Sequence, residues 1–371
     1  MTATFIRPDD SRWGTALGRL KHDVYHLPGY ALLCARYEHA EPLAFYAEID
    51  DCVCLVPLLV KRLGVTFDVD PSWCDMTSPY GYACPLYSHP DNPDEVLAFL
   101  GTLRDEAFKA KACSVFLRSN PLLPAQYTQL PPLTAWVPLG ETVVINLHDS
   151  EEKIWSNIRK GHKQDIQSLR KLNASIVMDD WNLYGEFVRI YHETMGRVHA
   201  NSYYMFSDDY FSDLRTSLPG NLHMCCVLLP DGRVAAAGLF TVEDGICQYH
   251  LSGTNSGCGN LPATKYMLHH MSLWARQRGC SVLHLGGGVG AQHDSLFKFK
   301  EGFSHELRPF GTCRIVPDES RYVIVAGGAS HSLDTIGSLR ADFFPLYRRD
   351  TVAEAPIRAA NSLDDNSKPA T

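Results

Sequence analysis

Two regions of the sequence repeat one order of predicted elements, and this repetition limits the fold more than any other feature. Each region has strand-like runs, then a loop that contains glycine, then a helix and a further strand. The helix-to-strand junctions also read alike, KACSVFL around Cys113 and RGCSVLHL around Cys280, which lie 167 residues apart. The repetition predicts a tandem duplication of one α/β unit.

The predicted elements can be placed by their turn residues and apolar runs. In the first region we expect strands at 43–49 and 53–60, a loop at 78–85, a helix at about 93–110 and a last strand at 114–117. In the second region we expect strands at 224–229, 234–242 and 247–251, a loop at 252–260, a helix at 262–277 and a last strand at 282–285. A helix at 13–26, ended by Pro28-Gly29, is expected to precede them.

Composition excludes several classes of protein. The longest apolar stretch, 53–60, is far shorter than the roughly 20 residues of a membrane helix, and the start MTATFIRPDD lacks the pattern of a secretory signal. Twelve cysteines in 371 residues, with no CxxC pair, do not suggest a disulfide scaffold. We therefore expect a cytoplasmic protein without membrane insertion. The net charge of −8 excludes a general nucleic-acid coat, so any nucleic-acid contact must come from a local basic patch.

One such patch lies on a helix predicted from Glu151 to about Leu172, with Asp149 or Ser150 as its cap. At about 100° per residue, its cations gather on one face while its apolar residues occupy the opposite arc. This face could follow a phosphate backbone, or it could be an ordinary solvated surface. The cations that would contact RNA are Arg159, Lys160, Lys163, Arg170 and Lys171.

A glycine-rich segment, LHLGGGVGAQHDSLFKFKEGF at 283–303, is the second candidate. Its GxGxxA pattern formally fits a dinucleotide loop, but only a short helix, Asp294 to about Lys300, can follow, which argues against a Rossmann site. The glycines could let a substrate approach the backbone, or form a simple tight turn. Lys298 and Lys300 alternate with Phe297 and Phe299, so a lysine here could be a fixed cation for a developing oxyanion, or an ordinary surface lysine.

Two further segments contain residues that could bind a metal or a ligand. HDVYH at 22–26 has the histidine spacing of a zincin helix, but Asp23 replaces the catalytic glutamate and Pro28 stops the helix, so no metal site is expected. The segment 191–211 is dense in polar and aromatic residues that could clamp a ligand, or could be a helix end followed by a packed turn.

Several of these segments together resemble the Fem-type (FemABX-like) branch of the GNAT acyltransferase superfamily. The segments that carry the resemblance are DVYHLPGY, SPYGYACP, IRKGHKQDI, ETMGRVHANSYYMF, HLSGT and HLGGG…DSLFKFKEGFS. The resemblance covers about 11–315 and implies two tandem GNAT-like domains, each a mixed central sheet flanked by helices. We expect domains at 1–148 and 149–316, with 317–350 a candidate completion of the first, and a disordered tail at 352–371.

The resemblance also implies an activity, the transfer of an aminoacyl group from a charged tRNA to an amine. Lys300 would be the cation for the oxyanion, Phe299 would shape the site, and Lys298 is the reserve. The substrate contacts would be Tyr80, Tyr82, Arg197, Tyr203, Tyr204, His250, Ser252, Gly287 and Asp294. No cofactor or metal is implied, because aminoacyl-tRNA is the co-substrate. The acceptor would be a small-molecule amine or a cell-wall precursor, and the sequence indicates no oligomeric state.

Two alternatives remain open. A conventional GNAT enzyme would take an acyl group from acetyl-CoA or another acyl-CoA, whose pyrophosphate is held by backbone amides of a turn that opens a helix. The corresponding loop here, GTNSGCGN before Pro262, lacks the leading glutamine or arginine of that turn. The second alternative is a non-catalytic binding module that keeps the fold.

Overall fold

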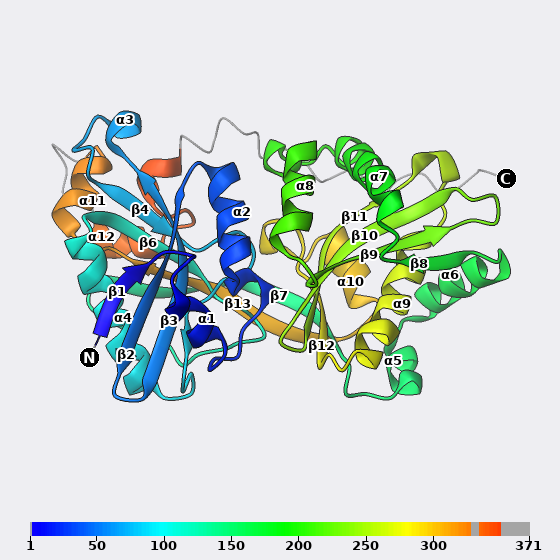
Figure 1. The fold of residues 1–371 in the computed structure, drawn as a ribbon, viewed down its shortest axis with the longest axis horizontal. Helices are drawn as coiled ribbons and strands as arrows, with labels where there is room; N and C mark the ends of the chain where they lie inside the picture. The colour runs from blue at the N-terminus through cyan, green and yellow to red at the C-terminus, as the bar shows by residue number, and fades with distance from the viewer. Residues whose placement is uncertain (1, 328–333, 350–371) are drawn as a thin grey trace. The chain divides into compact units, whose positions relative to one another are not determined.

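The computed structural model describes residues 2–327 and 334–349, which form two compact units (Figure 1). Within these residues, unit 1 comprises 2–141, 212–221 and 308–349, and unit 2 comprises 142–211 and 222–307. The division differs from the expected boundaries: the chain leaves unit 1 within strand β7 (Thr134–Asn146), and 308–316 cluster with unit 1. The expected disordered tail, 352–371, lies outside the described residues.

Unit 1 contains a sheet in the order β1-β2-β3-β4-β6-β13-β7, with β5 beside β3. Its strands are β1 (Thr2–Ile6), β2 (Glu41–Ile49), β3 (Cys52–Arg62), β4 (Cys74–Thr77), β5 (Leu86–Tyr87), β6 (Ala112–Arg118), β13 (Glu306–Ile315) and the first part of β7. The strands β4 and β6 pair in parallel, and helix α4 (Pro93–Lys109) connects them.

Helices cover both faces of this sheet. Neighbouring residues of a strand point to opposite faces, so Ala44 and Tyr46 of β2 pack with α1 (Ser11–Leu17) and α2 (Pro28–Glu38), whereas Phe45 and Ala47 pack with α4. The short helices α3 (Gly64–Phe67), α11 (Glu319–Val325) and α12 (Thr335–Arg340) also belong to unit 1.

Unit 2 repeats the arrangement in the order β7-β12-β11-β10-β9-β8. Its strands are β8 (Ser175–Met178), β9 (Leu222–Leu228), β10 (Val234–Glu243), β11 (Ile246–Thr254), β12 (Val282–Gly286) and the second part of β7. Here β11 and β12 pair in parallel, and α9 (Ala263–Gln277) connects them. The remaining helices of this part of the chain are α5 (Glu151–Asn157), α6 (Lys160–Lys171), α7 (Tyr184–Arg197), α10 (Ser295–Glu301) and α8 (Asp208–Ser217), which passes into unit 1.

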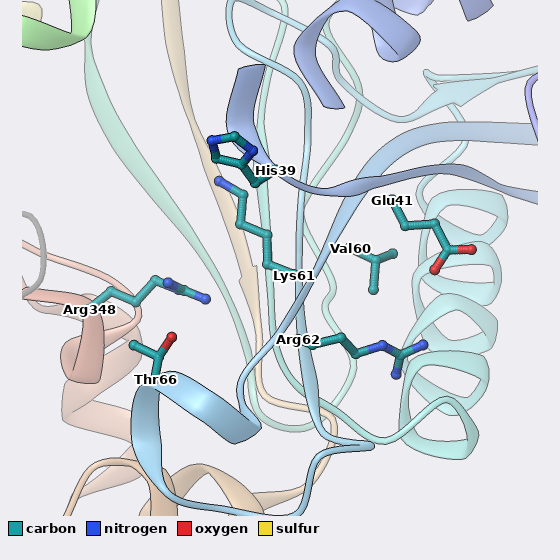
Figure 2. Close-up of a pocket in the computed structure, with 7 residues that line it drawn as sticks. All are labelled: His39, Glu41, Val60, Lys61, Arg62, Thr66 and Arg348. Atoms are coloured by element: carbon teal, nitrogen blue, oxygen red, sulfur yellow. The ribbon is translucent and has the colours of Figure 1, made fainter. Parts of the chain in front are cut away.

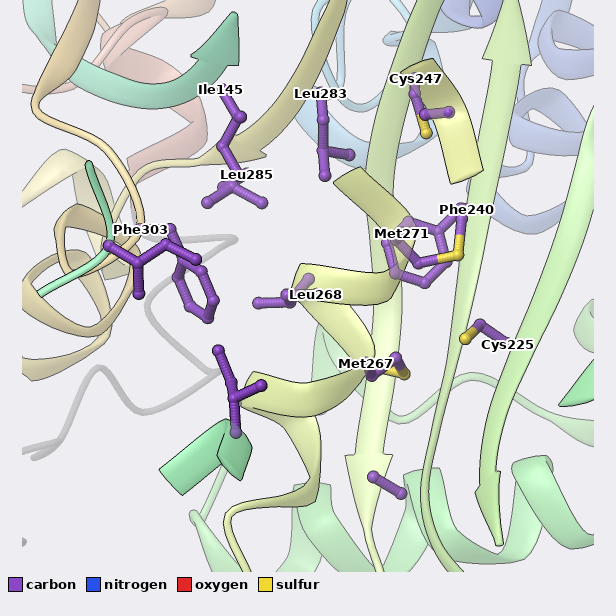
Figure 3. Close-up of a cluster of buried hydrophobic side chains, with 14 of the residues drawn as sticks. Ile145, Cys225, Phe240, Cys247, Met267, Leu268, Met271, Leu283, Leu285 and Phe303 are labelled. Atoms are coloured by element: carbon purple, nitrogen blue, oxygen red, sulfur yellow. The ribbon is translucent and has the colours of Figure 1, made fainter. Parts of the chain in front are cut away.

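The core of unit 2 lies between the sheet and α9. Met267, Leu268 and Met271 of α9 pack on Phe240 and Leu283 of the strands (Figure 3). On the other face α7 approaches β11 so closely that a Cβ on Gly253 would lie 2.6 Å from the Ile190 carbonyl oxygen. Each unit therefore is a mixed sheet flanked by helices, and the expected tandem α/β fold is confirmed.

Two predicted helices were wrong. The helix expected at 13–26 ends at Leu17, and Asp23 instead caps a 3-10 helix, Val24–His26. Pro28 does not stop a helix but begins α2, since a proline in the first turn loses no helical hydrogen bond. The zincin spacing of His22 and His26 therefore does not lie on one α-helix.

The predicted helix from Glu151 to Leu172 is two helices, α5 and α6. Ile158 and Arg159 are extended between them, and the Arg159 N–H donates to the Gly302 carbonyl at 2.9 Å. A tertiary hydrogen bond thus replaces a helical one at the break. None of the described helices combines the length and the apolar composition needed to cross a membrane.

Candidate active site

The site is built at the end of the parallel pair in unit 2. Pairing of β11 with β12 runs only from Ile246–Val282 to Gln248–His284, whereas β11 continues beside β10 as far as Thr254. The two parallel strands therefore part near their carboxyl ends, where ligands commonly bind in α/β folds. The glycine-rich segment leaves β12 at this point.

Lys300 reaches this point from α10. The residue is only 8% exposed, and its Nζ donates to the Gly287 carbonyl oxygen at 2.6 Å. Gly286 has a φ of 78°, which favours glycine, and a Cβ there would lie 3.3 Å from the Lys300 Nζ. An ammonium has three N–H donors, and Gly287 uses one, so further donors remain for a ligand oxygen.

Asp294 holds the glycine-rich loop against α10. Its Oδ1 accepts from the Phe297 N–H at 2.8 Å as the helix cap, and its Oδ2 accepts from the Val289 N–H at 3.1 Å. A Cβ on Gly288 would lie 2.3 Å from Asp294 Oδ1, so the loop passes too close for a larger residue. Asp294 thus joins the glycine-rich loop to the first turn of α10, the helix that carries Lys300.

Burial tunes the charges around the site. It lowers the pKa of Lys300 to about 8, and the charge of Asp294 opposes this shift. Burial, followed by the charge of Lys300, lowers the pKa of His284 to about 3, so this imidazole is neutral. His284 Nδ1 is hydrogen-bonded to Gln248 Oε1 across the last register pair of the parallel strands. The sequence interpretation missed this polar pair.

The side chains of Lys298 and Phe299 do not lie at the site where Lys300 contacts Gly287. Lys298 is exposed on another side of the short helix. The Phe299 ring packs on His162 and Phe303, at centroid distances of 5.5 and 5.6 Å, and its carbonyl accepts from His162 Nε2 at 2.9 Å. Phe299 thus anchors α10 to α6, while the buried His162 is a support residue that the sequence interpretation also missed.

A bulge shapes β11 beside the point where the strands part. Leu239 pairs with Leu251 and Phe240 with Tyr249, so His250 is the extra residue. The bulge brings the Tyr249 and Ser252 hydroxyls into a hydrogen bond. Burial lowers the pKa of His250 to about 4, which leaves its ring neutral.

Arg197 ends α7 and contacts the end of β11. Its Nη2 donates to Thr254 Oγ1 at 2.6 Å, and Thr194 of the same helix receives the Thr254 N–H at 2.9 Å. Tyr203 and Tyr204 follow on a 3-10 helix (Ser202–Tyr204), where their rings meet edge to face with centroids 5.5 Å apart. Tyr203 is exposed and Tyr204 partly buried.

The five predicted RNA-binding cations lie on or beside α6. Arg159 donates to His162 Nδ1 at 3.0 Å, Lys163 to the Ser156 carbonyl at 3.0 Å, and Arg170 lies over the Trp155 ring. Lys160 and Lys171 are exposed, and no ion pair or hydrogen bond within the described residues holds their side chains.

The loop between β11 and α9 is occupied by the protein's own groups. The Glu193 carboxylate accepts from the Ser256 N–H at 3.2 Å and from the Ser256 hydroxyl, and Asn255 Oδ1 accepts from the Gly257 N–H at 2.9 Å. The negative charge of Glu193 disfavours a pyrophosphate at these amides.

The remaining predicted contacts, Tyr80 and Tyr82, belong to unit 1, where the Tyr82 ring meets Phe310 and Tyr25. Unit 1 also contains a cavity of about 350 Å³ (Figure 2), and no predicted site residue lines it. Its lining residues are His39, Glu41, Val60, Lys61, Arg62, Thr66 and Arg348. Three of these residues are cations with partners of their own. Lys61 pairs with Glu38, Arg62 donates to the Ser72 carbonyl, and Arg348 pairs with Asp75.

Part of the chain is similar to a known domain family. Residues 156–300 match the model of the acetyltransferase (GNAT) domain family, a span that ends at Lys300. No curated protein matches the sequence of the chain.

Solved structures share the fold across most of the chain. FemX is 12% identical, with a TM-score of 0.68 over 87% of this chain and 99% of that one. L-PGS from Bacillus licheniformis is 12% identical, with a TM-score of 0.52 over 88% and 98%. The C-terminal domain of a putative lysylphosphatidylglycerol synthetase from Agrobacterium fabrum is 12% identical, with a TM-score of 0.50 over 86% and 94%. The chain thus has the Fem-type GNAT fold that its motifs indicate, with the GNAT domain match in unit 2.

Proposed function

We propose that the protein transfers an aminoacyl group from aminoacyl-tRNA to the amine of a small molecule or a cell-wall precursor. The observation that carries the proposal is the buried Lys300 ammonium, fixed on the Gly287 carbonyl where β11 and β12 part. The shared fold of FemX supports it.

In this reaction the acceptor amine attacks the ester carbonyl of the charged tRNA. A C–N bond forms, and the carbonyl oxygen gains the negative charge of a tetrahedral intermediate. When the intermediate collapses, the C–O bond to the ribose breaks, the amine gives up a proton and the ribose hydroxyl takes one. The ester is already activated, so the main demand on the protein is stabilisation of the oxyanion.

Lys300 meets that demand. A pKa of about 8 leaves it mostly cationic at neutral pH. An ammonium in a buried, preorganised position stabilises a developing oxyanion more strongly than one in water. Asp294 and the glycine-rich loop hold it in place through the α10 cap.

The α6 cations supply a surface for the tRNA phosphates. Arg159 also donates to the Lys298 carbonyl at 3.4 Å, so the start of this surface is tied to the helix that carries Lys300. Of the five predicted α6 cations, Lys160 and Lys171 are exposed and are held by no ion pair or hydrogen bond within the described residues, so they are proposed to bind phosphate. Arg197, Tyr203 and Tyr204 are proposed to contact the acceptor, as are His250 and Ser252.

The match to an acetyltransferase domain favours a second candidate, transfer from acyl-CoA. Glu193 argues against it, because its carboxylate binds the N–H and the hydroxyl of Ser256 in the loop that would hold the pyrophosphate.

One experiment separates the two donors. The protein is incubated with a cell extract as the source of amines and with tRNA that carries labelled amino acids, with and without ribonuclease, and in parallel with labelled acetyl-CoA. We expect label in a ribonuclease-resistant amide only when intact charged tRNA is supplied. Transfer from acetyl-CoA alone would contradict the proposal.

A further inference from the structure

Three side chains that bind metals well meet in unit 1, at the end of the β2–β3 hairpin. Cys52 is the first residue of β3, His89 follows β5, and Glu95 lies in the first turn of α4. Their ligand atoms all lie within 4.8 Å of one another. None of the three belongs to the site described in unit 2.

The fold brings Cys52 and His89 together through strand register. Cys54 pairs with Tyr87, and the Ser88 N–H donates to the Val53 carbonyl at 3.0 Å, so the antiparallel register sets Cys52 opposite His89. Asn92 caps α4 and thereby fixes the first turn that presents Glu95. Glu95 Oε1 accepts from the His89 N–H at 3.0 Å.

One imidazole nitrogen faces two other ligand atoms. His89 Nδ1 lies 2.7 Å from Glu95 Oε2 and 3.6 Å from Cys52 Sγ. This nitrogen has either one proton or one lone pair, so it can make only one of these bonds well. A cation between the three atoms would bind all of them at once.

The donor set points to zinc. Thiolate, imidazole and carboxylate are its usual ligands, at about 2.0–2.3 Å in tetrahedral geometry, which sets ligand atoms about 3.3–3.8 Å apart. The His89–Cys52 separation of 3.6 Å lies in that range, the His89–Glu95 separation of 2.7 Å is shorter, and the third pair lies within 4.8 Å. Side-chain rotations would bring all three ligand atoms to tetrahedral distances. The His89 side chain is 64% exposed and that of Glu95 only 7%, which leaves the fourth position on the solvent side.

We propose that Cys52, His89 and Glu95 bind a zinc ion whose fourth ligand is water. Binding releases the thiol proton to solvent and joins the start of β3 to the first turn of α4. The ion would stabilise unit 1, and the proposal is independent of the transfer reaction.

Cobalt tests the proposal directly, because Co²⁺ replaces zinc and a thiolate ligand gives it a strong near-ultraviolet charge-transfer absorption. We expect one Co²⁺ to bind the full-length protein with that absorption, and Zn²⁺ to displace it and raise the melting temperature. Cys52→Ser should remove the absorption, and Glu95→Gln should weaken Zn²⁺ binding at least tenfold. Cys258→Ser is the matched control, because Cys258 and Cys52 are the cysteines that are not fully buried.

His89→Ala guards against a folding artefact, because its ring is mostly exposed. This variant should fold and lose Zn²⁺ binding. The proposal is overturned if the wild-type protein shows no thiolate-to-cobalt absorption, or if the Cys52 and His89 variants bind Zn²⁺ as tightly as the Cys258 variant.

Discussion

The two units share one order of strands and helices, but their parallel strand pairs end differently. In unit 1 contacts with β6 continue past the end of β4: the Ser78 N–H donates to the Phe116 carbonyl at 2.9 Å, and the Arg118 N–H to Ser78 Oγ at 3.1 Å. In unit 2 the pairing of β11 with β12 stops at Gln248–His284, and β11 runs on without β12.

The residues that follow β6 in unit 1 and β12 in unit 2 also differ. After β6, the buried Asn120 donates to Asp23 Oδ2 at 2.9 Å and to the Tyr82 carbonyl at 3.2 Å, and its Oδ1 accepts from the Leu122 N–H. After β12 come three glycines and the buried Lys300. The two units thus differ at the carboxyl ends of their parallel strands. In unit 1 the polar groups there bind one another, whereas in unit 2 the Lys300 ammonium has N–H donors left for a ligand.

Outside Lys300 itself, the largest loss of transfer rate is expected from Gly288→Ala. The new Cβ would meet the Gln292 carbonyl oxygen and Asp294 at 2.1 and 2.3 Å, so the loop must move and carry Lys300 with it. A misplacement of about 1 Å costs on the order of 100-fold in rate, measurable as single-turnover transfer. Gly185→Ala in α7, where a Cβ meets nothing within 4 Å, is the control and should keep the wild-type rate. A normal rate for Gly288→Ala would remove the loop from the mechanism.

In unit 1, Asn120→Ala should lower stability and leave the reaction intact. The change removes three hydrogen bonds from a buried site, one of them to a carboxylate, and should cost about 2–3 kcal/mol of unfolding free energy. Urea denaturation measures the cost, and the transfer rate per folded molecule should be unchanged. A rate loss without a stability loss would show that unit 1 also contributes to chemistry.

Stability should depend on pH through Lys300. Its folded pKa, about 8, is below the ordinary value of 10.5, so between these values the unfolded chain binds more protons and the unfolding free energy rises with pH. From pH 7 to 9.5 the wild-type protein should gain about 2 kcal/mol relative to Lys300→Met. Denaturant titrations at both pH values measure the difference. Parallel pH profiles for the two proteins would show that Lys300 is not desolvated.

The smallest effect is expected on the surface of α6. Removing the exposed cations with Lys160→Ala and Lys171→Ala should each lower the slope of log affinity for tRNA against log salt by about 1. Filter binding over a range of salt concentrations tests this. Lys109→Ala in unit 1, an exposed lysine paired with Glu106, is the control. Equal slopes for all three variants would make the α6 cations an ordinary solvated face.

Much of the fold could be predicted from local pattern. The strands β2, β3, β9, β10, β11 and β12 and the helices α4 and α9 lie within a few residues of their expected positions, because apolar runs and turn residues mark them. The two helix predictions were wrong where contacts between residues far apart in the sequence decide the backbone conformation. Arg159 leaves the helix to bond Gly302, and Asp23 caps a new turn where spacing suggested a continuous helix. The chain passes from unit 1 to unit 2 within β7, and no local sequence pattern marks that point.

The candidate site was predictable only in part. The motif around Lys300 singled out that residue together with Lys298, but only the structure separates the buried lysine from the exposed one. Gln248 and His284 are 36 residues apart and meet through parallel register, which a single sequence does not reveal. The Cys52, His89 and Glu95 cluster likewise depends on strand register and on the position of α4.

The central claim is that the open end of unit 2 works through the Lys300 ammonium. The most direct test compares Lys300→Ala with Lys298→Ala, two changes on the same helix, in single-turnover transfer from charged tRNA, after circular dichroism has shown both variants folded. We predict a loss of on the order of 100- to 1000-fold for Lys300→Ala, the scale of one lost oxyanion donor, and a change of less than about threefold for Lys298→Ala. A near wild-type rate for Lys300→Ala would contradict the account.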